Sequence, residues 1–133
     1  MGTRSYIGLK EKDDSLIFVY CHWDGYVENN GNILVTHYDT EKKVRELLKN
    51  GSFSALDPNP SQISYYADSE SQNDLEIYTF NDVDELKKDF KNDKWIGIEF
   101  FYIFDTDTNQ WIVSNSYNDD LNFEKVTDVL NNL

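Results

Sequence analysis

The order of apolar and polar residues along the chain predicts a sheet with several short helices. Runs rich in β-branched and aromatic residues are separated by polar segments, as is typical of strands joined by turns. Hairpin turns are predicted at 12–14 and at 105–110. Strands are predicted at 5–10, 16–23, 63–67, 75–80, 95–104 and 111–114, with 63–67 the weakest of these patterns.

Both faces of the segment 16–23 are largely apolar, which predicts a strand covered on both sides. One face carries Ile17, Val19, Cys21 and Trp23, and the other carries Leu16, Phe18, Tyr20 and His22. In the segment 95–104 the same alternation places on one face Ile96, Ile98, Phe100, Tyr102 and Phe104. It places on the other face Gly97, Glu99, Phe101 and Ile103.

Helices are predicted where apolar residues recur at helical spacing behind a capping residue. The segment 32–38 is ambiguous between strand and helix, and its spacing favours a short helix. Thr40 is predicted to cap a helix over 41–50, which ends before Gly51.

Two further helices are predicted in the second half of the chain. One runs over 82–92, with Asn81 or Asp82 as its cap, and the last begins at Asn122. We therefore expect a single α+β domain over residues 1–133, with an antiparallel sheet of about five or six strands and three or four helices.

The net charge of the chain limits which classes of partner it is expected to bind. The 133 residues carry a net charge of −13, whereas binding to phosphates requires Lys and Arg. We therefore expect no direct nucleic-acid binding and no membrane, but attraction to a protein with a basic surface. No run approaches membrane-spanning length, and residues 1–5 lack the apolar core of a signal peptide.

Sequence motifs set limits on cofactors and location. A single Cys excludes an internal disulfide and a Cys-only zinc site, which fits a cytoplasmic location. No Gly-rich phosphate loop, serine-nucleophile elbow or dinucleotide fingerprint is present, so no cofactor is expected. The run 105–109 resembles the start of a calcium loop, but Gln110 and Ser116 stand where Gly and Glu are needed, and a hairpin turn explains it better.

The segment 20–26, Tyr-Cys-His-Trp-Asp-Gly-Tyr, concentrates unusual side chains at the end of a predicted strand. It contains the only Cys, one of two His, one of three Trp and two of nine Tyr. Asp24-Gly25 is typical of a turn. Because Trp23 continues the face of Ile17 and Val19, it is predicted to enter the core, whereas His22 and Asp24 are predicted to be exposed and to carry function.

Two kinds of site are compatible with this segment. An aromatic pocket for a nucleotide-type ligand would use His22, Trp23, Asp24, Tyr26, His37 and Tyr38. A metal site would use the two His-x-Asp pairs formed by His22, Asp24, His37 and Asp39. A Cys21 nucleophile paired with His22 is excluded, because neighbours on a strand point to opposite faces, so Cys21 is interpreted as buried and structural.

The acidic residues are unevenly distributed. No Lys or Arg occurs from residue 51 to residue 85, a stretch with eight acids. If these side chains share one face, they could imitate a phosphate backbone and bind a basic protein. The predicted acidic contact surface comprises Asp68, Glu70, Asp74, Glu76, Asp82, Asp84 and Glu85.

Three stretches together resemble a family of small proteins from bacteriophages and bacterial mobile elements. They are the opening Met-Gly-Thr-Arg-Ser-Tyr-Ile-Gly, the 20–26 segment, and 31–38 with the helix pattern over 43–48. The resemblance covers roughly the first 55 residues and implies a phage origin without implying a reaction. A phage-encoded protein of this kind would be found in the host cytoplasm.

Three hypotheses follow. The first is a small acidic phage-type accessory protein that binds and inhibits a host nucleic-acid-handling defence protein, in an anti-CRISPR or anti-restriction manner. The second is sequestration of a nucleotide-type small molecule by the 20–26 segment. The third is a metal-dependent hydrolase that uses the two His-x-Asp pairs.

Overall fold

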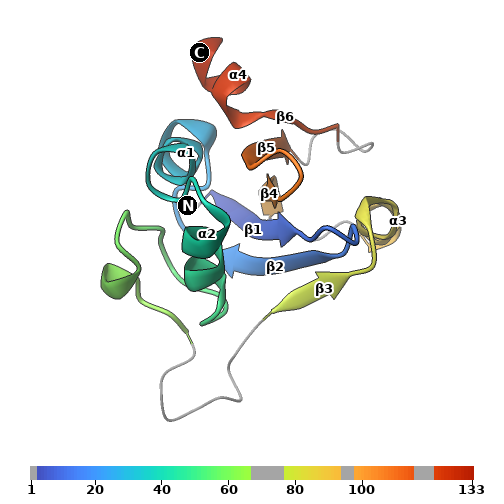
Figure 1. Ribbon diagram of the computed structural model, residues 1–133, viewed down its shortest axis with the longest axis horizontal. Helices are drawn as coiled ribbons and strands as arrows, with labels where there is room; N and C mark the ends of the chain where they lie inside the picture. Colours follow the sequence, from blue (N-terminus) through green and yellow to red (C-terminus); the bar gives the residue numbers. More distant parts are fainter. Residues whose placement is uncertain (1–2, 67–76, 94–97, 116–121) are drawn as a thin grey trace.

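The computed structural model describes residues 3–66, 77–93, 98–115 and 122–133 (Figure 1). These residues form one six-stranded sheet in the order β3-β2-β1-β4-β5-β6, with four α-helices. The strands are β1 (Arg4–Lys10), β2 (Leu16–Cys21), β3 (Tyr78–Phe80), β4 (Ile98–Asp105), β5 (Gln110–Asn115) and β6 (Glu124–Lys125). The helices are α1 (Asn32–His37), α2 (Glu41–Leu48), α3 (Val83–Asp93) and α4 (Val126–Asn131), with a π-helical turn at Val27–Gly31 and a 3₁₀ turn at Pro60–Gln62.

The predicted α+β class is confirmed, and the sheet is mostly antiparallel. The exception is its central pair, since β1 and β4 run parallel. A parallel pair needs a long connection between its strands, and here the chain forms β2, β3 and three helices before β4 begins.

The sheet separates two apolar cores, as the two-faced pattern of 16–23 predicted. Val19 and Cys21 face the core that contains Leu34 of α1, residues of α2, and Val126 of α4. Leu16 and Phe18 face the second core, which contains Leu86 and Phe90 of α3. Accordingly, α3 lies apart from α1 and α2 in Figure 1.

A β-bulge in β4 corrects one predicted face. Arg4 pairs with Ile98, but the next residue, Ser5, pairs with Phe100, so Glu99 is an extra residue in the ladder. Ile98 therefore packs with Phe101 in the α3-side core, and not on the face of Phe100 as predicted. A one-residue shift reverses the faces because strand side chains alternate with a period of two.

Capping residues set the starts of α2 and α3 as predicted. The Thr40 side chain accepts a hydrogen bond from Lys43 N at 3.3 Å, and Asp82 Oδ1 accepts one from Glu85 N at 2.8 Å. Gly51, after α2, has a φ of 81°, in the left-handed region that glycine tolerates.

Strand pairing overrides two predictions. The last helix does not begin at Asn122, because Glu124 and Lys125 pair with β5 as an edge strand and α4 begins after them. The predicted strand over 63–67 is reduced to an isolated bridge between Phe53 and Tyr65, and residue 67 lies outside the described residues.

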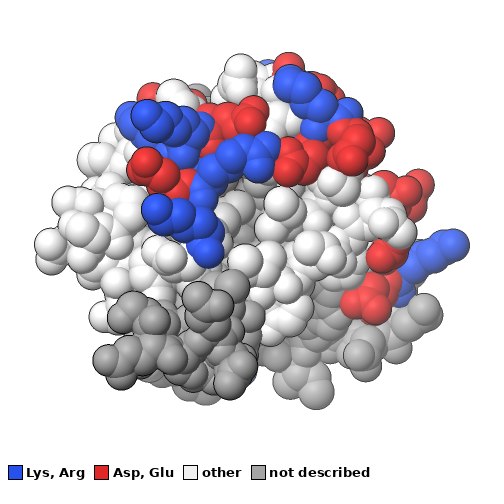
Figure 2. Space-filling model, turned by 60° about the horizontal axis from the view of Figure 1, so that its bottom comes forward, with Lys and Arg blue, Asp and Glu red and all other residues white. Residues whose placement is uncertain are grey.

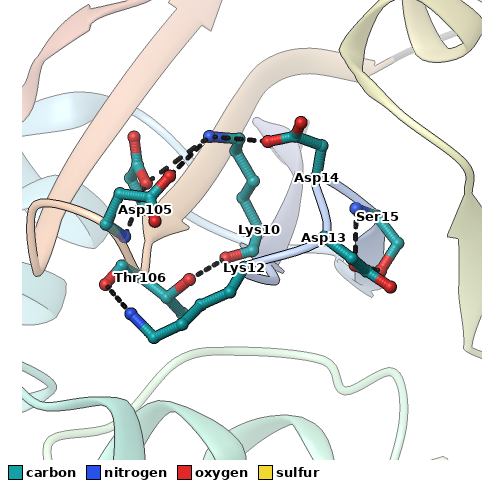
Figure 3. Close-up of polar contacts among 8 residues, drawn as sticks. Lys10, Lys12, Asp13, Asp14, Ser15, Asp105 and Thr106 are labelled. Carbon is teal, nitrogen blue, oxygen red and sulfur yellow. Dashed lines mark hydrogen bonds and ion pairs between the residues drawn. The ribbon is translucent and has the colours of Figure 1, made fainter.

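Polar contacts join the turn after β1 to the turn after β4 (Figure 3). The Lys10 ammonium lies 3.4 Å from Asp14, 3.7 Å from Asp105 and 3.4 Å from Asp107. Thr106 Oγ1 donates to the Lys10 carbonyl at 2.7 Å, and Lys12 Nζ donates to the Thr106 carbonyl at 3.1 Å. The calcium-like run is therefore a hairpin turn, as predicted, with a lysine among its carboxylates.

Candidate functional site

The 20–26 segment leaves the sheet because another segment takes over its hydrogen bonds. Phe53 N donates to the Tyr20 carbonyl at 2.9 Å, and Cys21 pairs with Phe53 as a parallel bridge. The His22 and Trp23 amides then donate to the Ser54 carbonyl at 3.1 and 2.8 Å. The strand therefore ends at Cys21, two residues earlier than predicted.

The turn at Gly25 is held from three directions. Gly25 N donates to the Thr3 carbonyl at 2.7 Å, and the Tyr102 hydroxyl donates to the Gly25 carbonyl at 2.6 Å. Asn29 Nδ2 donates to the carbonyl of Asp24, which has a φ of 56°. Asp is among the residues that tolerate this left-handed conformation, so the predicted turn is confirmed.

Cys21 is buried and structural, as interpreted from the sequence. Its thiol donates to the Trp23 carbonyl at 3.4 Å and accepts from Asn30 Nδ2 at 3.5 Å. Burial raises the pKa of the Cys21 thiol, which disfavours the reactive thiolate. These contacts fix the segment from its inner side.

Trp23 was predicted to lie in the core, and this is wrong. Its side chain is 44% exposed, and Tyr26 is 39% exposed. Asp24 is exposed, as predicted, whereas His22 is half-buried. The alternation that placed Trp23 inside ends with the strand at Cys21, after which the contacts with Ser54 set the direction of the side chains.

Five rings form a row from β3 across the sheet to this turn. We call Tyr78, Tyr6, Tyr20, His22 and Trp23 the aromatic row. Successive ring centroids are 5.4, 6.1, 5.9 and 4.6 Å apart. Tyr78 and Trp23 are exposed at its two ends, and the three rings between them are half-buried.

Polar contacts hold the middle of the aromatic row. The Tyr20 hydroxyl and His22 Nδ1 are 2.6 Å apart, which fixes the imidazole beside the Trp23 ring. Burial raises the pKa of Tyr20, while the nearby Arg4 guanidinium acts in the opposite direction. Tyr20 is therefore a neutral hydroxyl at physiological pH and can pair with either tautomer of His22.

Sequence reasoning missed Tyr6 and Tyr78 as members of this surface. Their signal is present, since each tyrosine lies in a predicted strand. What the sequence does not provide is the strand order that brings β1 and β3 to either side of β2. The row depends on that order, because Tyr6 contacts both Tyr20 and Tyr78.

Two residues predicted to bind a ligand, Tyr38 and His37, make no ring contact with the exposed aromatic side chains of the 20–26 segment in the described part of the chain. Tyr38 is buried, its hydroxyl donates to the Asp57 carbonyl at 2.6 Å, and its carbonyl accepts from Trp111 Nε1 at 2.8 Å. It therefore belongs to the core and cannot stack on a ligand. His37 is exposed at the end of α1, and the chain turns inward after it.

The predicted metal site is not formed. Within the described residues, which include all four candidates, no group of three or more His, Cys, Asp or Glu side chains could hold a metal ion. Asp39 instead pairs with Lys43 at 3.2 Å, and this contact lowers the pKa of Asp39. The metal-dependent hydrolase hypothesis therefore loses its site.

The predicted acidic surface is only partly described. Asp68, Glu70, Asp74 and Glu76 lie outside the described residues. Asp82, Asp84 and Glu85 are exposed at the start of α3, where Asp82 caps the helix and Glu85 Oε2 accepts from Asn81 N at 3.4 Å. On the face shown in Figure 2, acidic and basic side chains alternate in one band, so that face is not uniformly negative.

Two cavities open elsewhere on the described part of the molecule. One, of about 140 Å³, is lined by Val35, Asp39, Asn109, Gln110, Trp111 and Thr127. The other, of about 270 Å³, is lined by Leu9, Ile17, Arg45, Leu48, Lys49 and Ile77. Neither includes a side chain of the aromatic row, which is therefore a surface and not the lining of these cavities.

Comparison with protein-family models, with curated proteins and with solved structures finds no match for this chain. None of the described helices is both long and apolar enough to span a membrane.

Proposed function

We propose that this chain is a protein-binding module whose contact surface is the aromatic row together with Tyr26. The observation that carries the proposal is the 44% exposure of Trp23 on a backbone held by hydrogen bonds to Ser54. Exposed aromatic side chains dominate the energy of many protein interfaces. A ring already held in place loses little further freedom on binding, which favours affinity.

The charge around this surface supports a partner with a basic surface. Asp24 and Glu28 are exposed on either side of Tyr26, and the chain carries a net charge of −13. A guanidinium or ammonium group of the partner could lie over the Trp23 ring while these carboxylates attract it. The same charge disfavours direct contact with DNA or RNA.

The more specific proposal is inhibition of a host nucleic-acid-handling defence protein, in an anti-CRISPR or anti-restriction manner. It follows from the acidic composition and from the phage-type resemblance that the sequence motifs of the first 55 residues suggest, for which the comparisons found no match. It requires that nucleic acid and this chain compete for one basic surface. An excess of the partner's own nucleic acid should then release the captured partner, and stable ternary complexes would contradict competition.

Capture from host lysate with matched variants tests the contact surface. Trp23→Ala should reduce recovery of a basic partner at least tenfold, as for a residue that dominates an interface. Leu133→Ala, which shortens an exposed apolar side chain elsewhere, should leave recovery unchanged. Equal recovery with both variants would show that the aromatic row is not the contact surface.

Testing the role of the acidic side chains in capture requires separate variants that leave the helix caps intact. Asp24→Asn suits this purpose, because Asn also tolerates the φ of 56° at this position. Combined with Glu28→Gln it should weaken capture, and more strongly at low salt. Glu46→Gln, at an exposed position of α2, is the control. Reversal at Asp82 is unsuitable, because it would also remove the cap of α3.

A nucleotide-type ligand is the second candidate, favoured by the exposed Trp23 ring beside His22. Stacking of a base on Trp23 should quench its fluorescence and raise the melting temperature. A panel of nucleotides tests both effects. If no nucleotide changes either signal, this candidate is excluded.

A further inference from the structure

The larger cavity lies between α2 and the sheet, and its walls are aliphatic. Four apolar side chains line it, from β1, β2, α2 and the residue before β3: Leu9, Ile17, Leu48 and Ile77. Its volume of about 270 Å³ is close to the lower limit for pockets that hold small ligands, about 300 Å³. A dry cavity of about 150 Å³ accepts benzene, so this one has room for a short hydrocarbon chain.

The polar side chains of the cavity are two cations, and they differ in their surroundings. The Arg45 guanidinium already pairs with Glu11, where Nη1 lies 3.1 Å from Oε2, and with Glu41, where Nε lies 2.9 Å from Oε2. These contacts raise the pKa of Arg45 and neutralise it locally. Lys49, just past the end of α2, is exposed and forms no ion pair with any of the described residues.

An aliphatic wall beside a lysine that has no ion pair within the described part of the chain is complementary to one class of ligand. The hydrocarbon part of such a ligand leaves water, while its anionic end stays at the rim beside the cation. A ligand with a cationic end would be repelled by Lys49. Since Arg45 is already balanced by its two carboxylates, attraction of an anionic ligand would come from Lys49.

We propose that this cavity binds the acyl chain of a short fatty carboxylate, with the carboxylate at Lys49. The site shares no side chain with the aromatic row, so it is independent of the proposed protein-binding function. The two functions can therefore fail or succeed separately.

Titration of the unmodified chain with straight-chain carboxylates from butanoate to decanoate tests the aliphatic walls. Affinity should rise about fourfold per methylene, the equivalent of about 0.8 kcal/mol, until the cavity is full, and should then level off. Methyl NMR signals of Leu9, Ile17 and Leu48 should move during the titration. Shifts confined to other residues, or an affinity that does not depend on chain length, would overturn the proposal.

Octylamine and octanol test the role of charge. Octanoate should bind more tightly than octanol, and octylamine should bind most weakly. Lys49→Glu should weaken octanoate binding about tenfold and leave octanol binding nearly unchanged. Lys42→Glu makes the same charge change on α2 outside the cavity, and should leave octanoate binding nearly unchanged. Equal binding of octanoate and octylamine, equal effects of the two variants, or no octanoate binding would overturn the proposal.

Discussion

Replacing Gly25 with Ala tests whether close backbone contacts hold the turn that presents Trp23 and Tyr26. A Cβ added at Gly25 would lie 2.7 Å from the Thr3 carbonyl oxygen and 2.9 Å from Ser5 Cβ. Neither atom can move away easily, because Thr3 O accepts the Gly25 amide and Ser5 is fixed in β1 between two strands. The turn must therefore move, although Tyr102 also holds it.

The expected cost follows from these contacts. Overpacking of this kind costs about 1–3 kcal/mol. Loss of the hydrogen bond from Gly25 N to Thr3, or of that from the Tyr102 hydroxyl to Gly25, adds about 0.5–1.5 kcal/mol. We expect a total loss of about 2–4 kcal/mol in the free energy of unfolding, which for a chain of this size lowers the melting temperature by about 10 °C.

Urea denaturation followed by circular dichroism measures this loss. Gly31→Ala is the matched control, because Gly31 has a helical φ of −58° and its nearest neighbours are methyl groups of Val27 and Val126, at 2.9 and 3.1 Å. The Val27 side chain must shift to admit a Cβ at Gly31, but no hydrogen bond is lost there, so this control should cost less than Gly25→Ala. A cost for Gly25→Ala below about 0.5 kcal/mol, or one equal to that of the control, would refute the reasoning.

Three further predictions concern other parts of the structure. Trp23→Ala should cost less than about 1 kcal/mol in stability, whereas Trp111→Ala should cost about 3–5 kcal/mol, because Trp111 is only 3% exposed; urea melts that give equal costs would contradict this. Asp82→Ala should remove the cap of α3 and cost about 1 kcal/mol, compared with less than about 0.5 kcal/mol for Asp84→Ala, and similar melting temperatures of the two variants would exclude the cap. Burial raises the pKa of Tyr65 to about 12, so the stability contributed by its neutral form is fully present below pH 10 and is lost as pH rises from about 10 to 12. Tyr65→Phe should therefore lose less stability than the unmodified chain over that interval. If the free energies of unfolding of the two proteins fall in parallel with pH, ionisation of Tyr65 is not the cause.

Trp23 and Gly51 show which features of this chain can be predicted from local sequence and which cannot. Gly51 and the Thr40 cap were predicted correctly, because the groups involved lie within a few residues of one another. Trp23 was predicted from the same kind of local pattern, but its environment is set by the carbonyl of Ser54, which lies 31 positions further along the chain. Tyr38 was likewise assigned to a ligand site, whereas Asp57 and Trp111 hold it in the core.

By itself, the sequence determined the α+β class, most of the strands and helices, the two buried faces of β2 and the acidic character of the chain. These properties depend on composition and on periodicity over a few residues, which act in the same way wherever the segment lies. Only the tertiary structure decided the parallel pairing of β1 and β4, the bulge at Glu99, the outward direction of Trp23 and the row of rings from Tyr78 to Trp23. Each of these depends on contacts between segments far apart in the chain, and such contacts leave no periodic signal in either segment alone.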